Sequence, residues 1–241
     1  MSADTYLTNI LIRENVDTGP FSPARAVQAT LQPLLNEWGG ALIRNVSPSG
    51  SFAKGTAVRS GTDIDLFISI AQECTDSLGD IYGKLHGRLG EKGYSPKQQN
   101  VSINIRVGTY DVDLVPAKHQ GGNGHYHSLY RRRTNSWMQT NVATHISAVA
   151  NSGRTNEIRI IKLWRNQKQL DFPSFYLELT VLAALSGARG TLSQNVWKVF
   201  EYLTTSFAAA RVIDPSNTNN IVSDELSTAD RPALSLSRAR P

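Results

Sequence analysis

Residues 50–70 read GSFAKGTAVRSGTDIDLFISI, and this stretch decides the fold. Its second half alternates as a β-strand does: the even positions 64–70 are aliphatic, and the odd positions 63–69 include Asp63 and Asp65. Two acids on one face of a strand need solvent or a cation to offset their charge. Alternating acids are common on half-exposed strands, so this pair alone leaves a solvated face and a metal site equally open.

A second acidic pair favours a metal site. Residues 101–107 alternate as a strand, Gly108-Thr109 suggests a turn, and a return strand over 110–115 carries Asp111 and Asp113 in YDVDLVPA. If the acidic strands are neighbours, up to four carboxylates converge and raise one another's pKa. Two Mg²⁺ ions, with Mn²⁺ as a substitute, would offset that charge and also hold phosphate oxygens.

Gly50-Ser51 supplies groups that can bind phosphate. Glycine allows close approach of the backbone, and a serine hydroxyl with nearby N–H groups can donate to phosphate oxygens. Gly50 and Gly55 have the GxxxxG spacing, but Thr56-Ala57 follows where a Walker loop needs Lys-Ser/Thr. A Gly-Ser pair on its own is more often just a turn.

The bulk composition indicates a globular protein without a membrane segment. The 241 residues carry a formal net charge of +5, which favours an anionic partner only weakly, and Cys74 is the only cysteine. No internal disulfide can form, so a reducing cytoplasm fits best. No apolar run reaches transmembrane length, and no secretory signal is recognisable.

The chain predicts an α+β protein of two domains. We expect a helix from Ser22-Pro23 to Gly39, a strand over 41–46, a loop with perhaps one helical turn over 47–61, and a helix over 74–89. Residues 1–20 show no clear period, 118–135 form a polar connection, and helices follow near 158–164, 175–185 and 196–207. A mixed-sheet domain would span residues 1–140, and a helical lobe would span residues 141–241.

The stretch GSFAKGT…GTDIDLFI resembles the signature of the polymerase-β-like nucleotidyltransferase superfamily. The most similar branch holds oligoadenylate synthases, bacterial cGAS/DncV-like synthases (CD-NTases) and archaeal CCA-adding enzymes. The resemblance implies a nucleotidyltransferase fold, in which residues 1–140 form the catalytic domain and residues 141–241 form a lobe that closes a nucleotide cleft. It also implies that Asp63 and Asp65 are metal ligands. Asp113, which precedes Leu-Val-Pro as the third ligand does in that family, completes the set, and Asp111 is a neighbouring or supporting acid.

Three later segments extend the resemblance. IRIIKLWRNQ implies that Lys162 reaches the triphosphate, and SFYLELTVLAAL implies that Ser174 and Phe175 lie near the phosphates or base, with Glu178 orienting the helix. VIDPSNTNNIV matches the family's Asp-Pro…Asn segment through Asp214, Pro215 and Asn220. Without the first motif, the three segments would be interpreted as a solvated lysine, the first turn of a helix and a turn, respectively.

Two other features keep alternatives open. Arg131-Arg132-Arg133 could contact a nucleotide or nucleic acid, but three consecutive arginines cannot all face one site, so a mostly solvated surface is the expectation. His125-Tyr126-His127 lacks partners at zinc-binding spacing and is expected in a loop.

The sequence therefore predicts a template-independent nucleotidyltransferase that joins nucleoside triphosphates and releases pyrophosphate. We expect short cyclic or linear oligonucleotides, in bacterial anti-phage signalling with a separate effector protein. The alternatives are addition of nucleotides to RNA or tRNA 3′ ends, with an RNA or DNA oligonucleotide as partner, or nucleotidylation of a protein. The chain ends soon after the Asp-Pro segment, so no dedicated tRNA-binding tail is expected.

Overall fold

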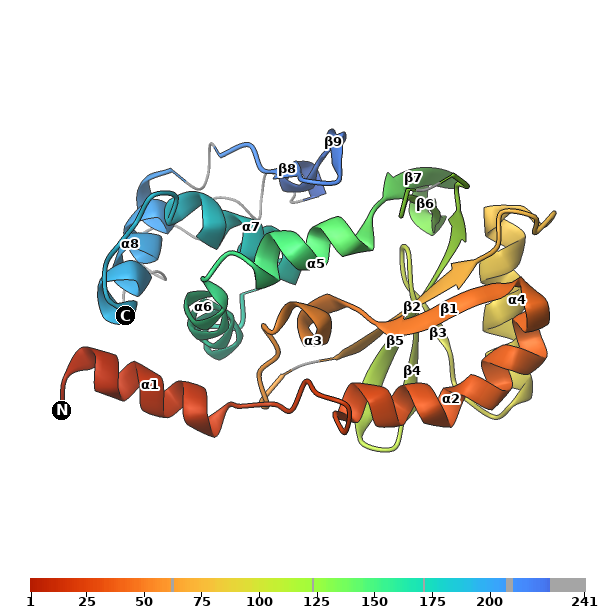
Figure 1. Ribbon diagram of the computed structural model, residues 1–241, viewed down its shortest axis with the longest axis horizontal. Helices are drawn as coiled ribbons and strands as arrows, with labels where there is room; N and C mark the ends of the chain where they lie inside the picture. The colour runs from red at the N-terminus through yellow and green to blue at the C-terminus, as the bar shows by residue number, and fades with distance from the viewer. Residues whose placement is uncertain (62, 123, 171, 207–209, 226–241) are drawn as a thin grey trace. The chain divides into compact units, whose positions relative to one another are not determined.

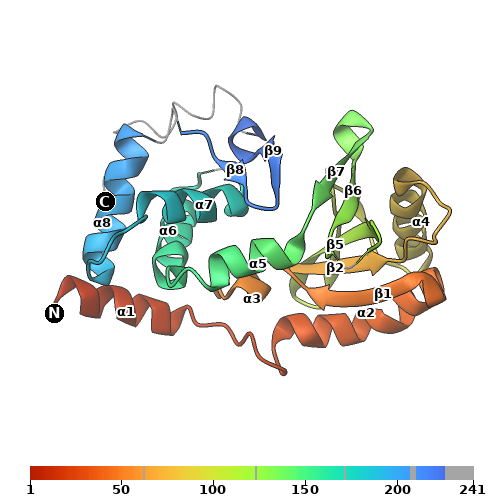
Figure 2. The same cartoon turned by 45° about the horizontal axis from the view of Figure 1, so that its top comes forward.

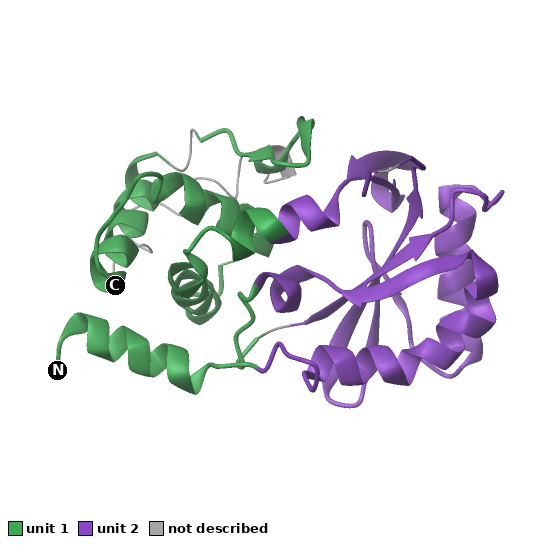
Figure 3. Cartoon of the chain, in the orientation of Figure 1, with its two compact units in different colours: residues 1–16, 55–62, 147–241 green, residues 17–54, 63–146 purple. Residues whose placement is uncertain are grey.

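The computed structural model describes residues 1–61, 63–122, 124–170, 172–206 and 210–225 (Figure 1). The chain divides into two compact units, coloured separately in Figure 3. The sheet unit comprises residues 17–54 and 63–146. The helical unit comprises residues 1–16 and 55–62 and the chain from 147 onward, so the chain passes between the units four times.

A mixed seven-stranded sheet forms the centre of the sheet unit (Figure 1). Its main path runs β1-β2-β5-β4-β3, and β5 also pairs with β6, which pairs with β7. The strands β2 and β5 are parallel, and the other pairs are antiparallel. The strands are β1 (Ile43–Pro48), β2 (Ile64–Ile70), β3 (Lys97–Gln98), β4 (Ile103–Val107), β5 (Tyr110–His119), β6 (His127–Arg131) and β7 (Ser136–Thr140).

Strand β5 changes its antiparallel partner along its length. It pairs with β4 up to Leu114 and with β6 from Ala117 onward. Pro116 lies at this changeover, where the missing proline N–H interrupts neither antiparallel ladder. A ten-residue strand can therefore cross the middle of the sheet despite its proline.

Helices α2 (Pro23–Gly39) and α4 (Leu78–Glu91) cover one face of the sheet (Figure 2). The side chain of Ser22 accepts a hydrogen bond from the N–H of Arg25 at the start of α2, and a Ser77–Asp80 capping box starts α4. The aliphatic even positions of β2 are buried on this side, which is the burial that the alternation predicts.

The opposite face of the sheet changes character along the strands. The acids lie where β2 and β5 begin. Phe67 and Ala117 then form an apolar cluster with Leu129 of β6. Beyond them, the buried side chains of Ser69 on β2 and His127 on β6 form a hydrogen bond across the intervening strand β5. The β6–β7 hairpin therefore packs on one end of this face. The other end, which carries the acids, stays polar and partly exposed.

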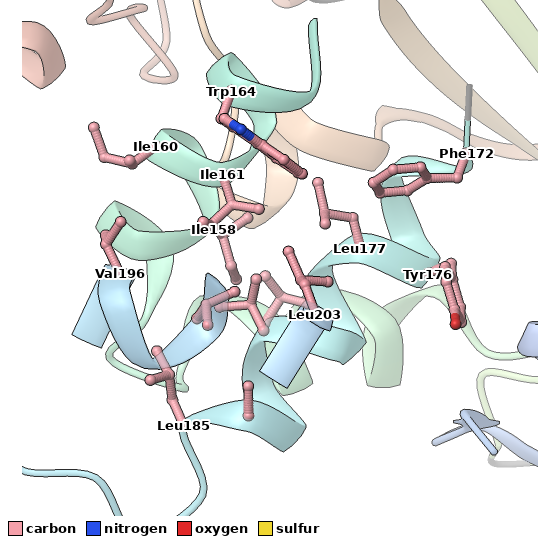
Figure 4. Close-up of a cluster of buried hydrophobic side chains, with 14 of the residues drawn as sticks. Ile158, Ile160, Ile161, Trp164, Phe172, Tyr176, Leu177, Leu185, Val196 and Leu203 are labelled. Carbon is pink, nitrogen blue, oxygen red and sulfur yellow. The ribbon is translucent and has the colours of Figure 1, made fainter. Parts of the chain in front are cut away.

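The helical unit is built around α6, α7 and α8. Its elements are α1 (Ala3–Arg13), α6 (Thr155–Gln167), α7 (Ser174–Ala184), α8 (Leu192–Thr205), the β8–β9 hairpin (Ile213–Asp214 and Asn217–Ile221) and a 3-10 turn (Val222–Glu225). Helix α5 (Val142–Ala150) carries the chain into it. Buried Ile161, Trp164, Leu177 and Leu203 are central to its apolar core (Figure 4).

The predicted fold class is confirmed, but several local expectations were wrong. Residues 3–13 form a helix that the sequence did not reveal, because its apolar face is narrow. The connection expected over 118–135 instead contains the end of β5 and all of β6, and His127 is buried in a strand rather than lying in a loop. Pairing with a neighbouring strand outweighed the polar composition there. Residue 207 and the Ser/Ala/Arg-rich last dozen residues lie outside the described residues.

No helix in the described ranges is both long and apolar enough to cross a membrane.

Candidate active site

Two of the predicted metal ligands face each other across the parallel strands β2 and β5. Asp65 and Asp113 are register partners, so their side chains leave the same face of the sheet on adjacent strands. Both are partly buried. The expectation that the two acidic strands are neighbours is thus confirmed.

Neutral amides hold the carboxylate of Asp113. Asn104 Nδ2 donates to Asp113 Oδ1 at 2.9 Å, and Gln99 Nε2 donates to the same oxygen at 3.2 Å. Burial raises the pKa of the Asp113 carboxyl above its ordinary value, and the charges of Asp63 and Asp111 raise it further, while the hydrogen bond from Asn104 opposes the shift.

The two remaining acids differ in their surroundings. Asp63 immediately precedes β2 and, like Asp111, is exposed, but partial burial of its carboxyl together with the charge of Asp111 raises the pKa of that carboxyl. Asp111 is exposed and forms an ion pair with Arg106 on the neighbouring strand, with 3.5 Å between Arg106 Nη1 and Asp111 Oδ2. Asp111 therefore has a cation beside it, whereas partial burial and neighbouring negative charges act on Asp63 and Asp113.

Gly50-Ser51 lies beside these acids. Gly50 opens the short helix α3 (Gly50–Lys54), and its φ of +52° lies in the region that favours glycine. A Cβ at this position would overlap the carboxylate of Asp65. The backbone N–H of Ser49 donates to the carbonyl oxygen of Asp65 at 2.8 Å, which ties the Gly-Ser turn to β2.

These carboxylates suit a divalent cation by their chemistry. Among the described residues, no group of three or more His, Cys, Asp or Glu side chains lies close enough together to coordinate a metal ion without other ligands. Mg²⁺ does not require one, because it commonly takes one or two carboxylates and completes its shell with water and phosphate oxygens. The raised pKa values of Asp63 and Asp113 indicate negative charge that a bound cation would relieve.

Lys162, predicted to reach the triphosphate, lies buried inside the helical unit. Its Nζ forms an ion pair with Glu178 Oε1 at 2.9 Å and donates to Thr56 Oγ1 at 3.1 Å. The Thr56 hydroxyl donates to the same Glu178 oxygen at 2.7 Å. The three side chains join α6, α7 and the segment 55–62, which connects Lys54 to Asp63 along the chain.

Ser174 and Phe175, the other two residues predicted near the nucleotide, begin α7. The exposed Ser174 accepts a hydrogen bond from Arg165 Nη1 at 3.0 Å. Phe175 is half-buried and packs against the core of the helical unit. Both belong, like Lys162, to the helical unit, while Gly50, Ser51 and the three acids belong to the sheet unit.

The structure adds hydrogen-bond partners that the sequence interpretation missed. Asp214 and Asn220, noted only as a family match, are hydrogen-bonded partners, with Asn220 Nδ2 donating to Asp214 Oδ2 at 3.1 Å. Asn104 and Gln99 were not singled out at all. The alternation of SINIR over 102–106 places Asn104 on the face of the acids, so this signal was available.

The chain has a relative among known proteins. Across 215 residues the chain is 25% identical to the cyclic AMP-AMP-AMP synthase of Escherichia coli (strain MS 115-1), an alignment that covers 80% of this chain and 67% of that one. This sequence match makes the E. coli synthase a relative of the chain. No family model matches it.

Solved structures confirm the nucleotidyltransferase fold. The Bradyrhizobium diazoefficiens CD-NTase CdnG, in complex with GTP, matches with a TM-score of 0.76 at 14% identity, over 98% of this chain and 89% of that one. CdnC of E. coli MS115-1 with ATP matches with a TM-score of 0.74 at 22% identity, over 96% and 87%. A cytoplasmic RNA terminal U-transferase shares the fold with a TM-score of 0.63 at 14% identity, over 98% and 92%. The resemblance found in the sequence is thereby confirmed.

Proposed function

We propose that this protein is a template-independent nucleotidyltransferase. It joins nucleoside triphosphates through phosphodiester bonds, releases pyrophosphate, and makes short cyclic or linear oligonucleotides. The observation that carries the proposal is the register pairing of Asp65 with Asp113, beside a glycine whose missing Cβ makes room for the Asp65 carboxylate. A structural sheet has no need of such crowded, partly buried acids.

Each residue of this cluster has a proposed task. Asp63, Asp65 and Asp113 would hold two divalent cations, Mg²⁺ or Mn²⁺. When bound, these ions activate the attacking hydroxyl and offset the charge of the leaving pyrophosphate. Gly50 and Ser51 would bind the phosphates of the incoming nucleotide through backbone N–H groups and a hydroxyl.

The helical unit supplies the second part of the proposal. Lys162, Ser174 and Phe175 are predicted to contact the nucleotide, and their unit is predicted to close a nucleotide cleft. For Lys162 this requires the ammonium to leave Glu178 and Thr56, which costs a buried ion pair. For Lys162, the proposed contact with the nucleotide therefore competes with a structural role, namely the buried ion pair inside the helical unit.

The kind of product is proposed from the relatives. The E. coli relative is named a cyclic AMP-AMP-AMP synthase, so a small cyclic adenine-containing product is the first to seek. A signalling nucleotide of this kind needs a protein that reads it. We therefore propose a separate effector protein and a place in bacterial anti-phage defence.

The deciding experiment is product analysis without added nucleic acid. Purified protein is incubated with Mg²⁺ and all four ribonucleoside and four deoxyribonucleoside triphosphates, and phosphatase-resistant products are identified by mass spectrometry. We expect short oligonucleotides from the native chain and none from the Asp63→Asn, Asp65→Asn double variant. An equal yield from that variant would overturn the proposal.

One observation keeps a second function in view. The fold is shared with an RNA terminal U-transferase, so addition of nucleotides to RNA 3′ ends is the alternative. Incubation of the same protein with labelled nucleotides and total RNA separates the two. Extended RNA without small products would favour the alternative, and this RNA binding would weaken steeply with salt.

A further inference from the structure

The carboxylates of Asp111 and Asp113 lie two residues apart on β5 but are held by different chemistry. Arg106, a cation, lies 3.5 Å from the Asp111 carboxylate on the exposed surface. Asp113 instead accepts two hydrogen bonds from uncharged amides, those of Asn104 and Gln99. Amide donors fix a carboxylate in place without supplying a positive charge, so Asp113 keeps the full attraction for a cation.

The two amides act on one oxygen. Asn104 Nδ2 and Gln99 Nε2 both donate to Asp113 Oδ1, which restricts rotation of the carboxylate and sets the direction of Oδ2. Asn104 is the register partner of Asp113 on β4, so its position is fixed by the strand ladder itself.

The orientation of the Gln99 amide is also set by a neighbour. Ser102 Oγ donates to Gln99 Oε1 at 2.8 Å, which leaves the amide nitrogen as the end that faces Asp113. A reversed Gln99 amide could still bond to the Ser102 hydroxyl, which also accepts, but it would place its oxygen against the Asp113 carboxylate. The observed orientation is thus the one that supports Asp113.

Hydrogen bonds from Tyr82 and Arg132 hold the loop that contains Gln99. Tyr82 Oη of α4 donates to the carbonyl oxygens of Gln99 and Ser102 at 3.0 and 2.8 Å. Arg132 Nε donates to the Gln99 carbonyl at 3.1 Å, and the Arg132 N–H donates to the carbonyl of Asn100 at 2.8 Å. One member of the arginine triplet therefore has a defined task within the sheet unit.

We propose that Asn104 and Gln99 are positioning residues that orient Asp113 for divalent-cation binding. This inference rests on the proposed function, since it assigns Asp113 to a metal site. It also separates the ligand from its neighbour: the acid held by amides binds the cation, and the acid paired with Arg106 does not.

The test measures metal binding directly. Mn²⁺ is titrated into native protein with a non-hydrolysable ATP analogue and followed by electron paramagnetic resonance, and the titration is repeated with Asn104→Leu and Gln99→Leu. Loss of a residue that orients a metal ligand typically weakens metal affinity about 10- to 100-fold, so we expect at least a tenfold loss for Asn104→Leu. Asn45→Leu, which changes an exposed asparagine of β1, should bind Mn²⁺ like the native chain.

A kinetic measurement then separates positioning from general damage. In Asn104→Leu the Mg²⁺ concentration for half-maximal product formation should rise about tenfold or more, while the KM for ATP at saturating Mg²⁺ should change little. Gln99 is exposed, so Gln99→Leu keeps the test usable if Asn104→Leu does not fold. Native Mn²⁺ affinity in the folded variants would overturn the positioning role and leave the proposed function standing. Absence of Mn²⁺ binding by the native protein would overturn both.

Discussion

The carboxylate of Asp65 fills the space in which a Cβ on residue 50 would stand. Gly50 also has a φ of +52°, so two independent constraints exclude larger residues. The Gly-Ser motif and the first acidic motif, fifteen positions apart in the sequence, are therefore parts of one packing arrangement.

Gly50→Ala should lose stability and activity together. The positive φ and the overlap with Asp65 must both be relieved, which we expect to cost about 1–3 kcal/mol in the free energy of unfolding and to displace the Asp65 carboxylate. Urea unfolding and product analysis check this. Gly93→Ala is the matched control, because Gly93 has a φ of +85° but nothing near its would-be Cβ. Equal losses of stability and activity in the two variants would mean that the overlap with Asp65 adds nothing to the cost of a Cβ at residue 50.

Asp63→Asn should stabilise the metal-free protein at neutral pH. Burial raises the pKa of Asp63, so the carboxyl contributes full stability below its unfolded pKa of about 3.9, and that stability is lost as the pH rises through the folded pKa. At pH 7 the native chain bears this cost, and the amide does not. Thermal unfolding in EDTA should show a higher midpoint for the variant.

Added Mg²⁺ with a non-hydrolysable ATP analogue should then raise the midpoint of the native chain more than that of Asp63→Asn. Glu73→Gln, which changes an exposed acid, should behave like the native protein in both conditions. Equal metal responses in the native chain and Asp63→Asn would exclude Asp63 as a ligand.

Lys162→Met should destabilise the protein strongly. It leaves the Glu178 carboxylate buried without its ammonium partner, a change that typically costs about 3–5 kcal/mol. The double variant Lys162→Met, Glu178→Leu removes both charges and should recover much of the loss in urea unfolding. If Lys162→Met were instead as stable as the native chain but raised the KM for ATP, the contact with the nucleotide would take precedence over the ion pair.

The pH dependence of stability should report on His127. Burial lowers the pKa of this imidazole from its ordinary value of 6.5. The hydrogen bond to the His125 carbonyl raises the pKa, and the charges of His119 and Arg44 lower it. The unfolded chain then takes up the proton first, so stability is complete above about pH 6.5 and falls as the pH drops towards the folded pKa.

Replacement of this imidazole should flatten that decline. In His127→Gln the unfolding midpoint should depend less on pH between 7 and 5, as measured by thermal unfolding. A native slope in His127→Gln would assign the pH dependence to other groups.

The acidic strands could be predicted because their information is local. Alternation fixed the faces of β2 and β5, and the turn at Gly108 fixed the β4–β5 hairpin. The β6 strand could not be predicted in this way, because it is polar in sequence and becomes a strand only by pairing with the last residues of β5. The partner of His127 is Ser69, fifty-eight residues earlier, and no local pattern announces such a contact.

Lys162 illustrates the same limit within the candidate site. Its place on a helix was predictable, since the apolar spacing of residues 158–164 indicates one face. Its partners were not, because Thr56 and Glu178 come from segments over a hundred residues apart. The sequence identifies candidate functional residues more readily than it identifies their hydrogen-bond and ion-pair partners.

The place of helix α1 has a consequence for synthesis of the chain. Asp4 accepts a hydrogen bond from the N–H of Ser193, and Arg159 donates to the carbonyl of Leu11, so the partners of α1 are made last. On the ribosome the first helix must wait, with its apolar residues uncovered, while the whole sheet unit emerges. Such long-range closure slows folding, and a chaperone that shields the nascent helix α1 should raise the yield of native protein.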